Sequence, residues 1–225
     1  MIDAVLNIST SYNLLVIDDG SPDGTANLVE QNFDKYKERL HLLKRPGKAG
    51  LGTAYITGFK WALQRDYDYI LEMDADFSHN PNDIARLIAA CEKGADMAVG
   101  SRYIPNGKVE NWPNNRIFIS RGASFYVRMI TWMPVHDATA GFVCYTKEVL
   151  NTIDLDSIRF IGYAFQIEMK FATWKCKFNI KEIPITFKDR EAGTSKMSKG
   201  IIKEAVWGVI AMRWHSFFRS YKKRG

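Results

Sequence analysis

The chain has 225 residues, of which 46% are hydrophobic and 25% charged, and its net charge is +6. This is the composition of a globular protein large enough for one sizeable core. The three cysteines, Cys91, Cys144 and Cys176, are odd in number and widely spaced. They argue against a disulfide framework or a zinc site and indicate a reducing compartment. The positive charge favours an anionic partner, such as nucleic acid, a phosphorylated substrate or a membrane surface.

The hydrophobic pattern predicts alternating short strands and helices. The first ten residues look like the end of an amphipathic helix. Strands are expected at residues 14–18, 40–43, 69–73, 96–100, 142–145 and 179–183. Helices are expected to end near residues 33 and 65 and to span 82–93, 115–133, 163–174 and 199–221. Alternation over the first hundred residues is typical of βαβ units and a parallel sheet. No secretory signal and no uncharged run long enough to span a bilayer is visible.

Two carboxylates one residue apart follow the strand at residues 69–73. Asp74 and Asp76 lie on the turn before the next helix, and open α/β sheets bind ligands at the carboxyl ends of their strands. Both side chains can reach one hard cation such as Mg²⁺ or Mn²⁺, which shares its ligand shell with substrate phosphates. The alternative is an Asx-rich turn in which Asn80 or Asn82 caps the next helix.

Three more polar clusters are expected where strands end. They are Asp18-Asp19, residues 44–52 and Ser101-Arg102. In a parallel sheet these ends share one edge, so the clusters would converge with the acidic pair. Carboxylates with basic groups are what a metal-bound diphosphate needs. Each cluster also has a purely structural alternative as a turn or loop, and the glycines match neither the dinucleotide fingerprint nor the P-loop.

Two basic segments follow further along the chain. The helix at residues 115–133 begins with Arg116, Ser120 and Arg121 and continues with apolar residues. Its start could hold an anion and its continuation a lipid, or it could be a core helix whose arginines extend to solvent. The glycine-containing loop at residues 187–198 carries several cations. It could close over a phosphate-bearing ligand, or it could be an ordinary solvated loop.

The last expected helix carries apolar residues at spacings of three and four. These are Trp207, Ile210, Trp214, Phe217 and Tyr221. Aromatic helices with basic flanks are typical of the membrane interface. The alternatives are packing on the domain and nucleic-acid binding, for which no recognised module is visible. We therefore expect a catalytic unit at residues 1–198 and an interfacial helix at 199–225.

Several motifs in this order resemble one family. They are Asp18-Asp19-Gly20-Ser21, Gly50-Leu51-Gly52-Thr53, Met73-Asp74-Ala75-Asp76, Gly100-Ser101-Arg102-Tyr103, Ser120-Arg121-Gly122, Asp189-Arg190 and Ser195-Lys196. Together they resemble the polyprenol (dolichol) phosphate mannosyltransferases, which are inverting glycosyltransferases, from residue 1 to about 200. The resemblance implies an α/β GT-A fold, Rossmann-like, with a mixed, mainly parallel sheet flanked by helices. It implies transfer of mannose from GDP-mannose to a polyprenyl phosphate at the inner, cytoplasmic face of a membrane, with no nucleic acid.

The resemblance also implies residue roles. The residues that would hold Mg²⁺ or Mn²⁺ on the donor diphosphate are Asp74, Asp76 and Ser78. Those that would bind the rest of the donor are Ile17, Asp19, Ala75, Arg102, Arg190 and Lys196. Those that would hold the lipid phosphate are Arg116, Ser120 and Arg102. Asp76, Arg102 and Arg190 would act in catalysis.

One departure from the family keeps alternatives open. The family begins with a strand that this chain lacks, which implies a sheet without one interior strand. The alternatives are a glucosyl- or N-acetylglucosaminyltransferase that uses a UDP-sugar, a non-catalytic protein that binds sugar nucleotides, and a basic peripheral membrane adaptor.

Overall fold

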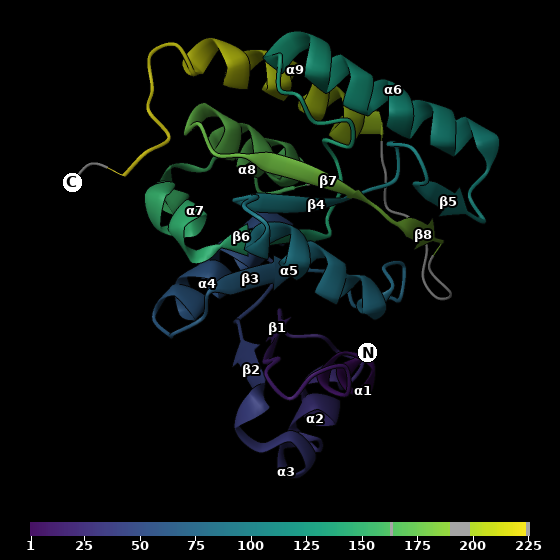
Figure 1. Cartoon of the computed structure of the whole chain (residues 1–225), viewed down its shortest axis with the longest axis vertical. Helices are drawn as coiled ribbons and strands as arrows, with labels where there is room; N and C mark the ends of the chain where they lie inside the picture. The colour runs from purple at the N-terminus through teal and green to yellow at the C-terminus, as the bar shows by residue number, and fades with distance from the viewer. Residues whose placement is uncertain (163, 190–198, 224–225) are drawn as a thin grey trace.

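A computed structural model describes residues 1–162, 164–189 and 199–223. Helices α6 (Asn114–Thr131) and α9 (Lys199–His215) lie side by side at one end of the molecule (Figure 1). The opposite end is formed by the first two strands together with α1 (Ile2–Leu6), α2 (Thr25–Glu30) and α3 (Phe33–Tyr36). Most of the remaining strands and helices lie between these two ends.

The strands of the described residues form three separate sheets. β1 (Leu14–Asp18) pairs in parallel with β2 (Leu40–Lys44). The central sheet has the strand order β3 (Tyr69–Glu72), β6 (Val143–Thr146), β4 (Met97–Ser101), β7 (Ile180–Pro184). Here β6 is antiparallel to both neighbours, whereas β4 and β7 are parallel. β5 (Lys108–Glu110) runs parallel to β8 (Thr186–Lys188). The predicted mixed α/β architecture is confirmed.

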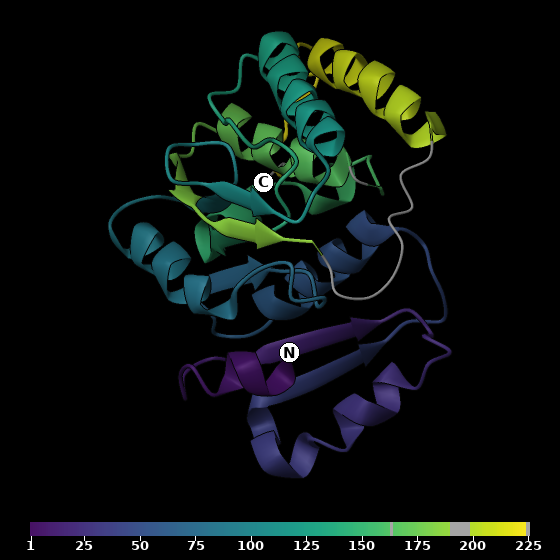
Figure 2. The ribbon, with the colours of Figure 1, turned by 90° about the vertical axis from the view of Figure 1, so that its right-hand side faces the viewer.

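The sheet is interrupted between β3 and β1. Within the described residues, β1 pairs only with β2, and β3 pairs only with β6. Both ribbon views place β1 and β2 beyond β3, on the side away from β4 (Figures 1 and 2). This interruption is what a sheet without one interior strand would show. The arrowheads of β1, β2 and β7 nevertheless lie on the same side of the molecule (Figure 2).

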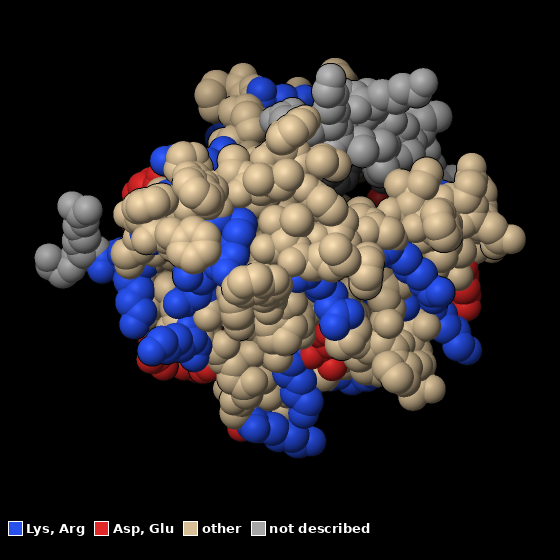
Figure 3. Space-filling model, turned by 90° about the horizontal axis from the view of Figure 1, so that it is seen from above, with Lys and Arg blue, Asp and Glu red and all other residues tan. Residues whose placement is uncertain are grey.

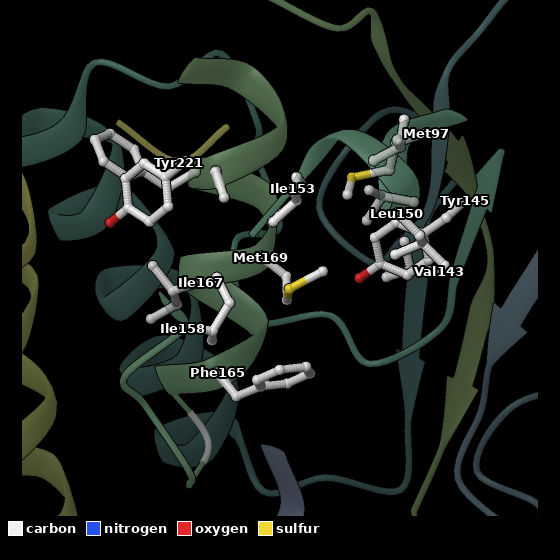
Figure 4. Packing of buried hydrophobic residues seen from close by; sticks show 14 of the residues in the cluster. Met97, Val143, Tyr145, Leu150, Ile153, Ile158, Phe165, Ile167, Met169 and Tyr221 are labelled. Atoms are coloured by element: carbon white, nitrogen blue, oxygen red, sulfur yellow. The ribbon is translucent and has the colours of Figure 1, made fainter. Parts of the chain in front are cut away.

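The main core lies between the central sheet and helices on one side of it. All of β4 is buried, as expected for a strand covered on both faces. Phe165 and Met169 point from α8 (Ala164–Lys175) toward Tyr145 on β6 (Figure 4). The other helices that contribute to this core are α4 (Leu51–Leu63), α6, α7 (Lys147–Thr152) and α9. Helix α5 (Ile84–Glu92) packs against β4 and β6 in a second hydrophobic cluster. Short 3₁₀ turns occur at Lys37–Arg39, Pro81–Asp83 and Leu155–Ser157.

The last helix is shorter than predicted. It ends at His215, and Tyr221 lies in the main core with 4% of its surface exposed. The Tyr221 ring meets Phe171 edge-on at 5.8 Å, and the backbone N–H of Lys223 donates to Thr152 O at 2.9 Å. The prediction that Tyr221 continues the exposed helical face is therefore wrong. A large aromatic gains more from the core than from the surface, so the chain turns back after α9.

A buried ion pair fixes the end of β4. The Nε and Nη2 atoms of Arg102 donate to the two carboxylate oxygens of Asp137, both at 2.7 Å. The backbone N–H of Arg102 donates to the same carboxylate at 2.9 Å. The backbone N–H of Asp137 in turn donates to Glu182 on β7 at 2.9 Å. Two strands and the segment before β6 are thereby joined at one point.

Removing the Asp137 charge should destabilise the fold strongly. Asp137→Asn leaves the Arg102 guanidinium buried without its anion, which costs about 3–5 kcal/mol in the free energy of unfolding. Denaturant unfolding of the variant and the wild type measures this loss. The matched control is Asp156→Asn, because Asp156 pairs with Lys60 but is 77% exposed, and we expect little change. Equal losses in the two variants would contradict the structural role of the pair.

The same pair predicts a pH dependence. Burial by itself raises the pKa of Asp137, but the Arg102 charge and hydrogen bonds outweigh burial and hold the pKa below its usual value. The contribution of Asp137 to stability is therefore complete above the unfolded pKa of about 3.9 and is lost as the pH falls through the lower folded value. The difference in unfolding free energy between wild type and Asp137→Asn should be full at neutral pH and shrink in acid below about pH 4.

Candidate functional site

The acidic turn after β3 bends sharply. Phe77 has φ +60°, a left-handed conformation that is rare for a large side chain. Asp74 and Asp76, on either side of Ala75, are half-buried, and Asp76 Oδ1 accepts the backbone N–H of Ser78 at 3.0 Å. Capping of the next helical turn is done by Asn80, whose side chain accepts the backbone N–H of Asn82. Asp76 therefore takes part in an Asx turn and Asn80 caps the next helical turn, as the Asx-turn alternative expects, and the cation-binding roles of Asp74 and Asp76 stay predictions.

The turn offers a divalent cation two hard oxygen ligands. No group of three or more histidine, cysteine, aspartate or glutamate side chains lies close enough to hold a metal in the part of the chain that the structure describes. Asp74 and Asp76 by themselves fit the usual protein share of a Mg²⁺ site, whose other ligands are phosphate oxygens and water. The Ser78 hydroxyl, predicted as a further ligand, is buried and has no hydrogen-bond partner among the described residues.

The first turns of α4 connect the acidic turn with the end of β1. Asp19 forms an ion pair with Arg45 Nε at 2.9 Å. Arg45 also donates to Thr53 Oγ1 at 3.0 Å, at the start of α4. Half a turn further, the Tyr55 hydroxyl lies 3.5 Å from Asp74 Oδ1. Asp19, predicted to contact the nucleotide, and Asp74, predicted to hold the cation, are thus linked through α4. They nevertheless follow strands of two different sheets.

The glycine-rich segment packs closely rather than forming an open loop. A Cβ atom on Gly52 would lie 2.6 Å from the carbonyl oxygen of Phe160, and the Gly52 N–H donates to Ile161 O at 2.8 Å. Ile17 packs on the same helix, because a Cβ on Gly58 would lie 2.8 Å from its Cδ1 atom. Of the predicted donor-binding residues, Ala75 is exposed.

Two aromatic side chains gather the residues predicted to hold the lipid phosphate. The Arg116 guanidinium lies 3.8 Å from the centroid of the Trp112 ring, and that of Arg102 lies 5.6 Å from it. The Tyr103 hydroxyl lies 2.6 Å from Ser120 Oγ, and Arg102 lies 5.0 Å from the Tyr103 ring. The structure thus brings Arg102, Arg116 and Ser120 together. We give the name basic-aromatic cluster to Arg102, Tyr103, Trp112, Arg116 and Ser120.

Sequence reasoning missed the part that Trp112 plays. It stands beside Pro113, just before α6, and an aromatic residue next to two predicted phosphate-binding arginines was the available signal. Arg121, also expected near the anion, lies 5.4 Å from the Tyr103 ring. Arg190 and Lys196 lie outside the described residues, so their predicted roles stay predictions.

His79 connects the basic-aromatic cluster with the acidic turn. Its ring is buried and lies 5.1 Å from Phe142 and 5.2 Å from Phe187, measured between centroids. Burial, followed by the Arg102 charge, lowers the pKa of His79 to about 4, whereas the Asp76 carboxylate opposes this shift. His79 is therefore neutral near pH 7. It was not predicted from the sequence. The Phe187 ring lies 5.2 Å from the His79 ring and 5.4 Å from the Arg102 guanidinium, and the N–H of Lys188 donates to Ser78 O at 3.1 Å, so the acidic turn and the cluster share one region.

A buried polar network surrounds Glu72, at the end of the strand that precedes the acidic turn. Lys170 on α8 is fully buried and donates to Ala140 O at 2.6 Å and to Gln166 O at 3.1 Å. Burial lowers its pKa to about 8, and burial raises the pKa of Glu72 to about 7 while the Lys170 charge opposes that rise. Glu72 also accepts the Tyr145 hydroxyl at 2.9 Å. The strand that carries the acidic turn is therefore anchored by polar as well as apolar contacts.

Comparison with known proteins gives close relatives. The chain is 46% identical over 202 residues to polyprenol monophosphomannose synthase of Mycolicibacterium smegmatis, covering 88% of this chain and 76% of that protein. It is also 46% identical over 207 residues to undecaprenyl-phosphate mannosyltransferase of Micrococcus luteus, covering 90% of this chain and 84% of that protein.

Solved structures show the same fold. Glucosyl-3-phosphoglycerate synthase of Mycobacterium tuberculosis, in complex with Mn²⁺, UDP and its product, matches with a TM-score of 0.64 at 15% identity, over 96% of this chain and 73% of that one. The same enzyme with Mg²⁺ and UDP matches with a TM-score of 0.66 at 14% identity, over 96% and 72% of the two chains. The fold is therefore GT-A. Residues 1–154 match the model of glycosyl transferase family 2, and this chain belongs to that family.

Proposed function

We propose that the chain transfers mannose from GDP-mannose to a polyprenyl phosphate with inversion at the anomeric carbon, giving a β-linked product. The observation that carries the proposal is that two partly exposed carboxylates, Asp74 and Asp76, lie in one region of the molecule with the basic-aromatic cluster, joined by contacts of Ser78 and His79 with β8. Carboxylates suit a metal-bound donor diphosphate, and arginines suit an acceptor phosphate. The two mannosyltransferase relatives support this choice of donor sugar and acceptor.

The acceptor needs no general base. The second pKa of a phosphate monoester is about 6, so the attacking oxygen is already anionic at pH 7. It forms a bond to the anomeric carbon while the bond from that carbon to the diphosphate breaks, and the diphosphate leaves with the electron pair. Arg102, Arg116 and Ser120 would position the acceptor phosphate and offset its charge. His79 is buried and neutral, and it would help to exclude water beside them.

The donor end depends on Asp74 and Asp76. These carboxylates would hold Mg²⁺ or Mn²⁺, and the cation would stabilise the charge of the leaving diphosphate. The Tyr55 hydroxyl beside Asp74 would orient that carboxylate, and burial first, then the charges of Glu72 and Asp74, raise the pKa of Tyr55 well above its usual value. Tyr55 therefore stays protonated and can donate its hydrogen bond throughout the neutral range.

Loss of one metal-binding carboxylate should abolish transfer. We expect Asp76→Asn to reduce the rate about a hundredfold or more, because the leaving charge loses its stabilisation. The measurement is radiolabelled mannose passing from GDP-mannose into a lipid-extractable product, with and without EDTA. Asp156→Asn is the matched control and should retain the wild-type rate, since that carboxylate is exposed and pairs with Lys60.

Two outcomes would count against this assignment. A rate for Asp76→Asn within a few-fold of wild type would remove the metal role from that residue. Faster transfer from UDP-glucose or UDP-N-acetylglucosamine than from GDP-mannose would replace the proposed donor with a UDP-sugar.

We also propose that the α6–α9 end of the molecule rests on a membrane surface. Large apolar side chains are exposed on both helices and just after α9; they are Phe118, Phe125, Trp132, Trp207, Trp214, Phe217 and Phe218. Basic side chains run between uncharged patches on this end (Figure 3). None of the described helices combines the length and apolar character needed to cross a bilayer. Aromatic and basic surfaces of this kind suit the interface of an anionic leaflet, here assigned to the cytoplasmic face.

Polar substitution on α9 and just after it should weaken membrane binding. The double variant Trp214→Ser with Phe218→Ser removes side chains that are 65% and 79% exposed, and we expect it to lose most flotation with vesicles that contain anionic phospholipid. Leu28→Ser is the matched control, because Leu28 is 59% exposed on α2 at the opposite end. Equal flotation of both variants would exclude this surface.

A further inference from the structure

Arg116, which is predicted to hold the acceptor phosphate, pairs with a carboxylate of the protein itself. Arg116 Nη1 donates to Asp189 Oδ1 at 3.1 Å and to Oδ2 at 3.3 Å. The Trp112 indole Nε1–H donates to the same Oδ1 at 3.2 Å. The Arg116 guanidinium lies 3.8 Å from the centroid of that indole ring. Two donors from neighbouring residues therefore converge on one carboxylate.

The two arginines of the cluster hold their anions very differently. The side chains of Arg102 and Asp137 are 8% and 0% exposed, and Thr139 also accepts from Arg102 at 2.9 Å. The side chains of Arg116 and Asp189 are 26% and 30% exposed. Exchange of a buried, bidentate partner carries a large desolvation cost, whereas a partly exposed pair is weak and easily replaced. Only the Arg116 partner is therefore exchangeable.

The backbone at Asp189 is tied down independently of its side chain. Its N–H donates to Glu110 O at 3.1 Å, which continues the pairing between β5 and β8. A rotation of the side chain can therefore release Arg116 without moving the strand. Ser120, one helical turn after Arg116 on α6, lies on the same helix face.

We propose that Asp189 occupies the place of the acceptor phosphate and is replaced by it, and that the Trp112 indole N–H then donates directly to that phosphate. A phosphate monoester carries more charge and more acceptor oxygens than a carboxylate, so it satisfies Arg116, Trp112 and Ser120 together. This inference rests on the proposed function for the identity of the ligand. It assigns Asp189 as a residue that sets acceptor affinity, and Trp112 as a further binding residue.

Competition by Asp189 has a defined consequence. A ligand that binds only the open form has an apparent dissociation constant equal to the intrinsic one divided by the open fraction. Removing Asp189 should therefore tighten the binding of every phosphate at this place by the same factor, about two- to fivefold for a partly exposed pair. If Asp189 instead served to orient Arg116, its removal would weaken binding.

The test is a binding titration that uses a short-chain polyprenyl phosphate, its methyl diester and inorganic phosphate as probes. We expect Asp189→Asn and Asp189→Ala both to bind each phosphate about two- to fivefold more tightly than wild type. The indole N–H also holds Asp189, so its donation to phosphate is tested in the Asp189→Asn background. There Trp112→Phe keeps the aromatic face but lacks the N–H, and the double variant should bind about fivefold more weakly than Asp189→Asn alone. Asp156→Asn is the control, and the affinity for GDP should be unchanged in all variants.

Each other outcome overturns the inference. Weaker or unchanged binding in both Asp189 variants excludes competition, and equal binding by Asp189→Asn with and without Trp112→Phe excludes the indole donor. Wild-type protein that binds none of the probes excludes a phosphate at this place altogether. Binding that responds as expected without any mannose transfer would instead overturn the proposed reaction and leave the exchange intact. Tightening for inorganic phosphate alone would exclude the lipid phosphate as the ligand.

Discussion

The ion pair between Arg102 and Asp137 is the constraint on which the candidate site depends. It buries a charge at the end of β4 and joins that strand to β7 and to the segment before β6. Because neither partner can leave the other without a large cost, Arg102 has one position. Tyr103, Trp112 and Phe187 all lie within reach of its guanidinium. The position of Arg102 within the basic-aromatic cluster therefore follows from this contact.

The two sides of the site differ in rigidity. On the acceptor side, Arg102 is fixed by a buried carboxylate, while Arg116 is paired with a partly exposed one. On the donor side, Asp74 and Asp76 stand on a bent turn supported by Tyr55 and by the buried Lys170 network. A glycosyltransferase must bind and release two charged substrates in each turnover, so groups that are fixed and groups that can exchange both have a place. The exposed aromatics of α6 and α9 lie at the end of the molecule that also carries Arg116 and Ser120.

Prediction from sequence succeeded where the signal was local. Strand positions followed from short apolar runs, and the acidic turn followed from two carboxylates one residue apart after a strand. Prediction failed where a helical periodicity was extended past the end of the helix. The periodicity of α9 suggested a helix to Tyr221, but the helix ends at His215 and Tyr221 returns to the core. The antiparallel direction of β6 likewise depends on pairing with β3 and β4, which no local pattern encodes.

The sequence by itself determined the family, the α/β alternation and the residue types at the strand ends, because these depend on the order and spacing of neighbouring residues. Only the tertiary structure decided how those residues are paired. Arg102 meets Asp137 across 35 positions, and Arg116 meets Asp189 across 73. Which carboxylate is buried and which stays partly exposed follows from the packing around them. That difference in desolvation separates a fixed cation from an exchangeable one.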